Sequence, residues 1–140
     1  MHKNFTFKVK IYYEDTDAGG VVYYANYLKF LERARTDAIT NFGFSNKKIK
    51  EDFGALIVVK SCDIEYKKSA ILEDNLNIRS FVKSVSRTSF KMMQIITRDN
   101  DTIVEAKIHL VFVDLVGKPV KIPNIIIDNF KPYFCDSIKK

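Results

Sequence analysis

The segment from Thr102 to Leu115 alternates between apolar and polar side chains, and this pattern constrains the fold more than any other feature. The apolar set is Val104, Ala106, Ile108, Leu110 and Phe112, and the polar set is Glu105, Lys107 and His109. A period of two is typical of a β-strand with one buried face. Such a strand needs neighbouring strands beside it and an apolar partner over its buried face.

Four further segments are predicted to be strands. They run from Phe5 to Tyr13, Ala55 to Lys67, Asn75 to Ser86 and Ser89 to Thr97. The turn sequences "RDND" at 98–101 and "LVGKP" at 115–119 follow the last two strands of the series. Because consecutive strands joined by short turns pair antiparallel, we expect an antiparallel sheet.

One long amphipathic helix is predicted to cover that sheet. Between Ala25 and Phe42 apolar residues recur every three to four positions, and Gly43 is a good C-terminal stop. A short helix capped by Ser45 is expected up to Phe53, and a last helix from Pro123 to about Phe134. The sequence therefore predicts one α+β domain over residues 1–140, an antiparallel sheet curled around a central helix.

Composition excludes several classes of protein. No stretch approaches the roughly 18 apolar residues of a membrane span, and charges interrupt the N-terminus where a signal peptide would be apolar. We therefore expect a cytoplasmic protein without stable membrane insertion. Cys62 and Cys135 are too isolated to indicate a disulfide framework or a thiolate metal site. The net charge of +6 favours anionic partners, but no nucleic-acid-binding motif accompanies it, and no nucleic-acid partner is expected.

The turn "EDTDAGG" directly before the long helix is the candidate functional motif. A calcium loop fits poorly, because Gly19 offers no side-chain ligand and Asn26 stands where a bidentate Glu is required. A structural reading remains open, in which an acid caps the turn and complements the helix dipole. A catalytic reading also remains open, in which Asp17 faces a carbonyl group held at the free N–H groups of the helix start.

The stretch "YYEDTDAGGVVYYANYLKFLERAR", from Tyr12 to Arg35, resembles the signature of the hotdog-fold acyl-CoA thioesterases of the 4-hydroxybenzoyl-CoA thioesterase family. It is most similar to the bacterial branch associated with the Tol-Pal system. The resemblance implies a hotdog fold and hydrolysis of an acyl-CoA thioester without a cofactor, coenzyme A being part of the substrate. It also implies a homodimer or homotetramer with each active site at a shared interface, and envelope or lipid-synthesis proteins as partners.

By the family pattern, Asp17 is the catalytic carboxylate and the backbone amide of Tyr24 polarises the thioester carbonyl. Val22 and Tyr23 would line the same pocket, and the packing of Tyr27 would set its depth. The Tol-Pal-associated branch commonly has His where this chain has Tyr24, so the natural acyl group does not follow from the resemblance. Asp17 as nucleophile and Asp17 as general base both remain open.

The other candidate residues carry weaker signals. Glu32 on the long helix is a rival carboxylate, although it stands among arginines. Arg87, Thr88 and Ser89 lie at a predicted strand start, and two readings stay open for them. Their donors bind the phosphate or pantetheine groups of coenzyme A, or the segment is an ordinary turn with one solvated Arg.

His2 and His109 indicate neither a metal centre nor a Ser-His pair. The alternative function is a scaffold protein that binds acyl-CoA or an acylated carrier without turnover.

Overall fold

A computed structural model describes residues 4–134 and has three α-helices and five strands in this part of the chain. The strands are β1 (Phe5–Lys10), β2 (Leu56–Tyr66), β3 (Asn75–Val85), β4 (Ser89–Arg98) and β5 (Asp101–Val113). The helices are α1 (Ala25–Asn41), α2 (Asn46–Phe53) and α3 (Asn124–Phe130), with 3-10 turns at Tyr13–Asp15 and Lys131–Tyr133. Each predicted strand and helix is present.

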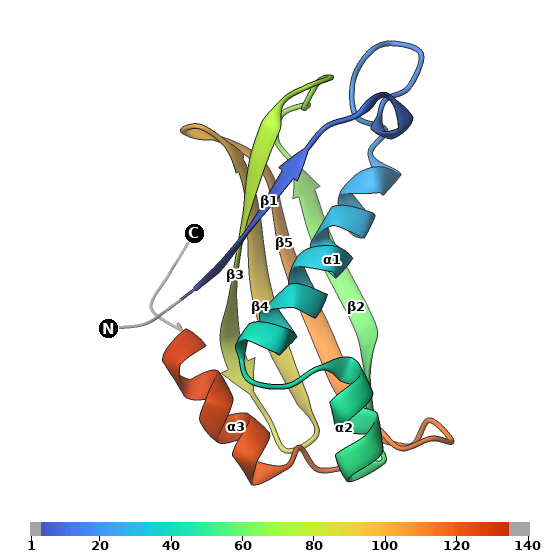
Figure 1. Ribbon diagram of the computed structural model, residues 1–140, viewed down its shortest axis with the longest axis vertical. Helices are drawn as coiled ribbons and strands as arrows, with labels where there is room; N and C mark the ends of the chain where they lie inside the picture. Colours follow the sequence, from blue (N-terminus) through green and yellow to red (C-terminus); the bar gives the residue numbers. More distant parts are fainter. Residues whose placement is uncertain (1–3, 135–140) are drawn as a thin grey trace.

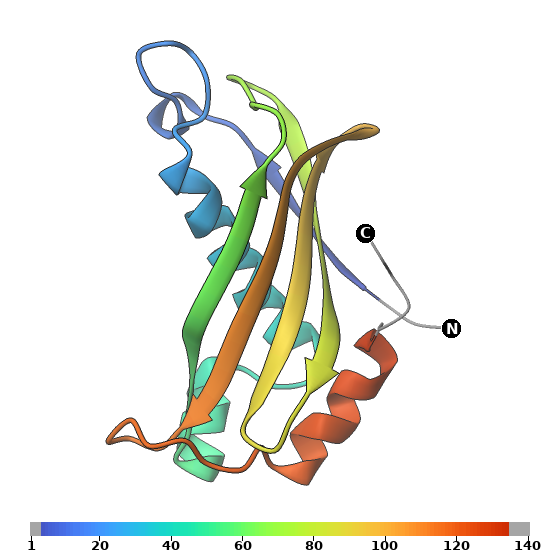
Figure 2. The same ribbon diagram turned by 180° about the vertical axis from the view of Figure 1, so that it is seen from behind.

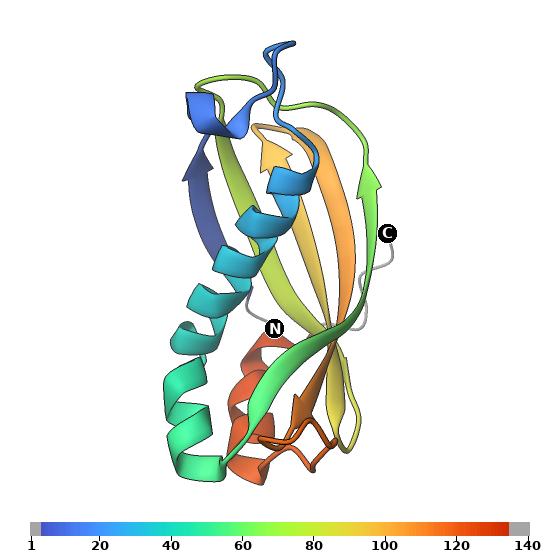
Figure 3. The ribbon, with the colours of Figure 1, turned by 90° about the vertical axis from the view of Figure 1, so that its right-hand side faces the viewer.

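The five strands form one sheet in the order β1-β3-β4-β5-β2, and all neighbours are antiparallel. The sheet curves around α1, which lies along its concave face (Figures 1 and 3). β2 precedes β3 in the chain but pairs with β5 at the opposite edge, because the connection of residues 67–74 carries the chain past β4 and β5. The predicted antiparallel sheet around a central helix is confirmed.

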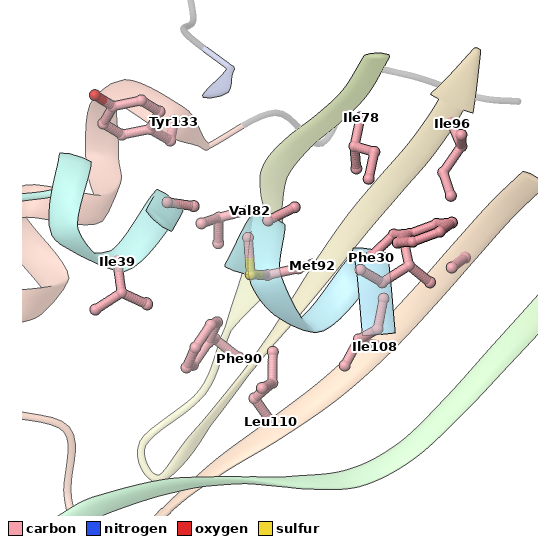
Figure 4. Close-up of a cluster of buried hydrophobic side chains, with 14 of the residues drawn as sticks. Phe30, Ile39, Ile78, Val82, Phe90, Met92, Ile96, Ile108, Leu110 and Tyr133 are labelled. Carbon is pink, nitrogen blue, oxygen red and sulfur yellow. The ribbon is translucent and has the colours of Figure 1, made fainter. Parts of the chain in front are cut away.

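The core lies between α1 and the concave face of the sheet. Figure 4 shows Phe30 and Ile39 of the helix facing side chains from β3, β4 and β5. Ala34 and Ala38 are fully buried, so two small side chains let the helix backbone lie close to the strands. Burying one large apolar side chain contributes roughly 1.5–3 kcal/mol, so this layer holds the helix firmly on the sheet.

Two element boundaries differ from the predictions. The first strand ends at Lys10 rather than Tyr13, because the backbone N–H of Tyr12 donates to Asp15 Oδ2 at 2.9 Å and the chain turns there. The last α-helix ends at Phe130 and continues only as a 3-10 turn. Pro132 lacks the N–H that another α-helical turn would need.

None of the helices between residues 4 and 134 has the length and apolar character that a membrane crossing requires.

Candidate active site

The acidic turn is fastened to the start of α1 through Asp15. Its carbonyl oxygen accepts the backbone N–H of Tyr23 at 3.1 Å and the Asn26 Nδ2 group at 2.9 Å. Its carboxylate accepts the N–H of Tyr12 at 2.9 Å. Asp15 therefore satisfies backbone and side-chain donors of the turn. This is the role that the structural reading of the motif assigns to one of its acids.

Asp17 lies at the exposed tip of this turn. Its N–H donates to Val21 O at 2.9 Å, and its Oδ1 accepts the N–H of Gly19 at 2.9 Å. A side chain at position 19 would bring a Cβ within 3.3 Å of Asp17 Oδ1, and Gly20 has a φ of +83°. The two glycines thus allow a tight turn around the carboxylate. Within residues 4–134, Asp17 Oδ2 accepts no hydrogen bond, and the residue is exposed.

Tyr24 immediately precedes α1, and its backbone N–H has no acceptor among the described residues. Unpaired N–H groups at a helix N-terminus carry partial positive charge and attract developing negative charge. The Tyr24 side chain is exposed, and its ring contacts that of Tyr66 on β2 with centroids 5.7 Å apart. The neighbouring ring of Tyr23 is also exposed, 5.2 Å from that of Tyr24. Both rings are therefore open to a ligand at the start of α1.

Val22 and Tyr27, also predicted to bind substrate, lie beneath this surface. Val22 is 4% exposed and donates its N–H to Ala70 O at 2.9 Å, while the Tyr27 hydroxyl, on a residue 2% exposed, accepts the N–H of Ala70 at 3.0 Å. Burial raises the pKa of Tyr27, although its hydrogen bond with Ala70 acts in the opposite direction. In the isolated chain these two residues hold the 67–74 connection against the site, and direct contact with substrate stays a prediction.

Arg87, Thr88 and Ser89 lie at the other end of the molecule. They occupy the turn between β3 and β4, opposite the end that carries the acidic turn (Figures 1 and 2). The length of α1 alone, about 25 Å at 1.5 Å per residue for its 17 residues, separates the two regions. A single chain does not bring the predicted coenzyme A-binding residues to Asp17.

Glu32, the rival carboxylate, is exposed on α1 and accepts a hydrogen bond of 2.8 Å from the Thr36 hydroxyl. The expected pairing with the neighbouring arginines is absent from the described residues. Arg35 instead donates to Gln94 Oε1 at 3.1 Å, and burial lowers its pKa. Sequence reasoning missed Gln94, a fully buried polar residue whose amide nitrogen donates to Ser80 Oγ at 2.9 Å.

Glu32 and Arg35 line a cavity of about 130 Å³ between α1, α2 and the sheet. One side of the cavity is polar, with Thr36 and Asn46 beside Glu32 and Arg35. The rest of the wall is apolar and consists of Ile39, Ile57, Val59, Phe90, Met92 and Leu110. Figure 4 shows Ile39, Phe90, Met92 and Leu110 around this part of the core. The cavity was not predicted from the sequence, because its walls come from α1, α2, β2, β4 and β5, which only the folded chain brings together.

The expectation that neither histidine belongs to a Ser-His pair is wrong for His109. Its Nε2 lies 3.0 Å from Ser89 Oγ, because β4 and β5 place the two residues on the same face of the sheet. This pair lies on the face opposite α1, away from Asp17. Cys62 is a free, exposed thiol on β2, whereas His2 and Cys135 lie outside the described residues. From residue 4 to residue 134, no group of three or more metal-ligating side chains is positioned to hold an ion.

The class that this arrangement defines is the hotdog-fold thioesterase. The chain belongs to the thioesterase-like superfamily, whose family model matches residues 12–130. The predicted fold and enzyme class, a thioester hydrolase, are thereby confirmed.

Three known proteins illustrate the relationship. The chain is 40% identical over 129 residues to the acyl-CoA thioester hydrolase YbgC of Escherichia coli O6:H1, covering 91% of this chain and 96% of that protein. A probable thioesterase from Bartonella henselae superposes with a TM-score of 0.83 at 29% identity, covering 86% of this chain and 100% of that one. A 4-hydroxybenzoyl-CoA thioesterase variant in complex with 4-hydroxybenzoyl-CoA has a TM-score of 0.85 at 22% identity, with coverage of 91% and 98%, and this likeness concerns the fold alone.

Proposed function

We propose that this chain hydrolyses the thioester of an acyl-CoA to the free acid and coenzyme A. Asp17 supplies the carboxylate, and the Tyr24 backbone N–H donates to the developing oxyanion. One observation carries the proposal: the turn before α1 contains both the Asp17 carboxylate, which has a free oxygen, and the Tyr24 backbone N–H, which has no acceptor among the described residues. The name of the Escherichia coli relative, an acyl-CoA thioester hydrolase, supports the substrate class.

Two chemical routes follow from this junction. As nucleophile, Asp17 attacks the thioester carbonyl carbon, coenzyme A leaves as the thiolate, and water then hydrolyses the mixed anhydride and restores the carboxylate. As general base, Asp17 takes a proton from water while the water oxygen attacks the same carbon, and the thiolate leaves with a proton returned to it. In both routes negative charge develops on the carbonyl oxygen, where the Tyr24 N–H and the helix dipole stabilise it.

A second copy of the chain is part of the proposal. β2 is an edge strand, and Val58, Val59 and Tyr66 on it are between 41% and 48% exposed. Edge strands with exposed apolar side chains invite pairing with another strand. Antiparallel pairing of β2 with its own copy about a two-fold axis sets the acidic turn of one chain beside the opposite end of the other. That end carries Arg87, Thr88 and Ser89, and the 130 Å³ cavity has Val59 of β2 in its wall.

In such a dimer the acyl group extends from Asp17 of one chain toward the cavity of the other. An apolar cavity of about 150 Å³ in another protein accepts a benzene-sized molecule. The cavity of about 130 Å³ is therefore suited to a short or compact acyl group. Envelope or lipid-synthesis proteins as partners stay a prediction from the family resemblance, as does a cytoplasmic location.

The test is a thiol-release assay over short, long and aromatic acyl-CoAs, with an Asp17→Asn variant alongside. Release that disappears in the variant supports the proposal, and the preferred substrate identifies the acyl class. Single-turnover hydrolysis in ¹⁸O-labelled water identifies the nucleophile route: water attack at the Asp17 carbonyl carbon of the anhydride leaves labelled oxygen in the Asp17 carboxylate, which the general-base route never does. Saturable acyl-CoA binding with no thiol release would instead favour the scaffold alternative.

A further inference from the structure

Strand β1 forms the edge of the sheet that lies opposite β2. Within residues 4–134 it pairs with β3 alone, and its outer side has no backbone partner. Figure 3 shows β1, in dark blue, at the edge of the sheet next to α1. An edge strand presents free N–H and C=O groups to a further strand. The six residues of β1 offer an edge of about 20 Å at 3.3 Å per residue.

A groove of about 270 Å³ follows this edge, between β1 and α1. Residues 7–10 of β1 line it in succession, so the groove runs along the strand. Phe7 and Val9 pack against the core, whereas Lys8 and Lys10 are exposed on the opposite face. A strand added here would therefore place its side chains alternately beside apolar groups and beside lysines.

Positive charge lies on both sides of the groove. Lys8 and Lys10 stand on the outer face of β1, and Arg33 lines the groove from α1. Arg79 on β3 is exposed and pairs with Thr6, diagonally next to Lys8. None of these four cations forms an ion pair or a side-chain hydrogen bond within residues 4–134. An anionic occupant would therefore displace no existing partner of these side chains.

Two acids also line the groove, and they do not neutralise it. The Asp15 carboxylate accepts the N–H of Tyr12 at 2.9 Å, so one of them is committed to the acidic turn. Glu14 is exposed beyond the end of β1. The cross-strand partners of Lys8 and Lys10 on β3 are both asparagines, so no carboxylate faces the lysines from that strand. The free charge along the edge is positive.

A second copy of this chain is a poor occupant for the β1 edge. Antiparallel pairing of two β1 strands would bring Lys8 and Lys10 of one chain close to those of the other, and like charges across two strands are destabilising. Lysines on edge strands prevent such self-pairing in many proteins. The same lysines favour a strand that carries acidic side chains.

We propose that the β1 edge binds an acidic, extended peptide segment of a partner protein by strand addition. The backbone of the segment pairs with the free edge, as in other proteins that recognise peptides in this way. Its acidic side chains face Lys8 and Lys10, and the alternate, apolar side chains pack beside Phe7 and Val9, with Arg33 across the groove. This site lies outside the proposed thioesterase reaction and does not rest on it.

The experiment measures fluorescence polarisation of a labelled peptide of alternating glutamate and valine, as long as β1. One control peptide alternates lysine and valine, and another has the glutamates and valines in two blocks. We expect saturable binding of the alternating acidic peptide, at least about tenfold tighter than that of either control. Equal binding of the block peptide would overturn strand addition, and equal binding of the lysine peptide would overturn the role of the cations.

N-methylated peptides test the backbone pairing directly. In an antiparallel pair, alternate residues direct their N–H groups to the neighbouring strand. Methylation of one alternate set should abolish binding, and methylation of the other set should leave it nearly unchanged. Equal effects of the two sets would overturn strand addition.

Lys8→Glu is the diagnostic variant, and Lys91→Glu on β4 makes the same charge change two strands away. We expect Lys8→Glu to weaken binding of the acidic peptide about fivefold to tenfold, with binding by Lys91→Glu unchanged. Equal weakening by both variants would show attraction to the overall charge and overturn the site. Light scattering during the titration tests self-pairing, because a fall in the mass of the assembly on peptide addition would show that a second copy already occupies this edge.

Asp17→Asn separates this inference from the proposed function. The variant should bind the acidic peptide as tightly as the natural chain, whatever its thiol release. Peptide binding by a chain without thioesterase activity would uphold the β1 site and refute the proposed function. Thioesterase activity in a chain that binds none of the peptides would refute the β1 site alone.

Discussion

Asp17 Oδ1 accepts the backbone N–H of Gly19 at 2.9 Å, which fixes the carboxylate while its second oxygen remains free. Asp15, two positions earlier, instead uses its carboxylate on the N–H of Tyr12. Neighbouring acids in one turn thus have different hydrogen-bond partners: the structural reading of the motif fits Asp15, and the proposed catalytic role falls to Asp17. This difference makes the two positions a matched pair for mutation.

We expect Asp17→Asn to lower kcat by about 100-fold to 10,000-fold, the usual contribution of a catalytic acid or base, without changing Tm. Asp15→Asn should instead leave kcat nearly unchanged and lower the stability of the fold by roughly 0.5–2 kcal/mol, because an amide in place of the carboxylate weakens the hydrogen bond from the Tyr12 N–H. Steady-state kinetics and thermal unfolding of both variants check this. An Asp17→Asn protein with near-normal turnover would refute the proposed role.

Asn26 is predicted to position the site without touching the substrate. Its Nδ2 donates to Asp15 O at 2.9 Å and so ties the acidic turn to the first turn of α1. Asn26→Asp removes this donor with little change in shape, and we expect a lower kcat with a nearly unchanged affinity for coenzyme A. Asn41→Asp is the control, because it removes a similar donor, to the Tyr133 hydroxyl, at the other end of the helix. Equal effects of both variants on kcat would refute a positioning role.

The sequence predicted the layers of the fold because each element carries its own periodicity. The alternation at Val104 to Phe112 is local, and so are the stripe of α1 and the stop at Gly43, which has a φ of +105°. Asp17 could be singled out as a candidate because the motif around it is contiguous in the chain, and its catalytic role stays a prediction. The bond between Asn26 and Asp15 O also lies within this motif, but sequence spacing does not reveal which acid takes the structural task.

Features that depend on strand register were not predicted. Gln94 reads as one polar residue on an apolar strand, and only the packing of α1 places it beside Arg35 and Ser80. His109 and Ser89 are 20 positions apart and meet because β4 and β5 pair in one particular register. No spacing within a single element encodes such a contact.

Gly20 should be essential to the turn because its φ of +83° is a conformation that side chains disfavour. Gly20→Ala costs roughly 1–2 kcal/mol in this conformation, and the strain is relieved by moving the adjacent Asp17. We expect Gly20→Ala to lower kcat by more than the lost folding stability explains. Gly117→Ala introduces comparable strain at a φ of +93° in the turn after β5 and should lower only Tm. Kinetics and calorimetry on the two variants would show whether activity responds to strain in the acidic turn alone.

Mutation of Val59 tests whether pairing of two copies of β2 is needed for activity. It is 48% exposed on the edge strand β2 and also lines the 130 Å³ cavity. Val59→Lys places a charge where two copies of β2 would meet, and like charges at such an edge oppose pairing. We expect the variant to lose the dimer in light scattering and to lose thioesterase activity with it, while Thr6→Lys on the other edge strand, β1, changes neither. A wild-type protein of one chain mass that is fully active would contradict the shared site.

Gln94 should stabilise the fold through hydrogen bonds that no other side chain replaces. Its amide nitrogen donates to Leu31 O at 3.1 Å and to Ser80 Oγ at 2.9 Å, and its oxygen accepts from Arg35. Gln94→Leu leaves these groups buried without partners, and an unsatisfied buried group costs about 1–3 kcal/mol. We expect a lower midpoint of urea unfolding with an unchanged m-value. Ser80→Ala removes only one of the contacts and should cost less. If Gln94→Leu is as stable as the natural chain, apolar packing alone holds α1 on the sheet and the polar network has another purpose.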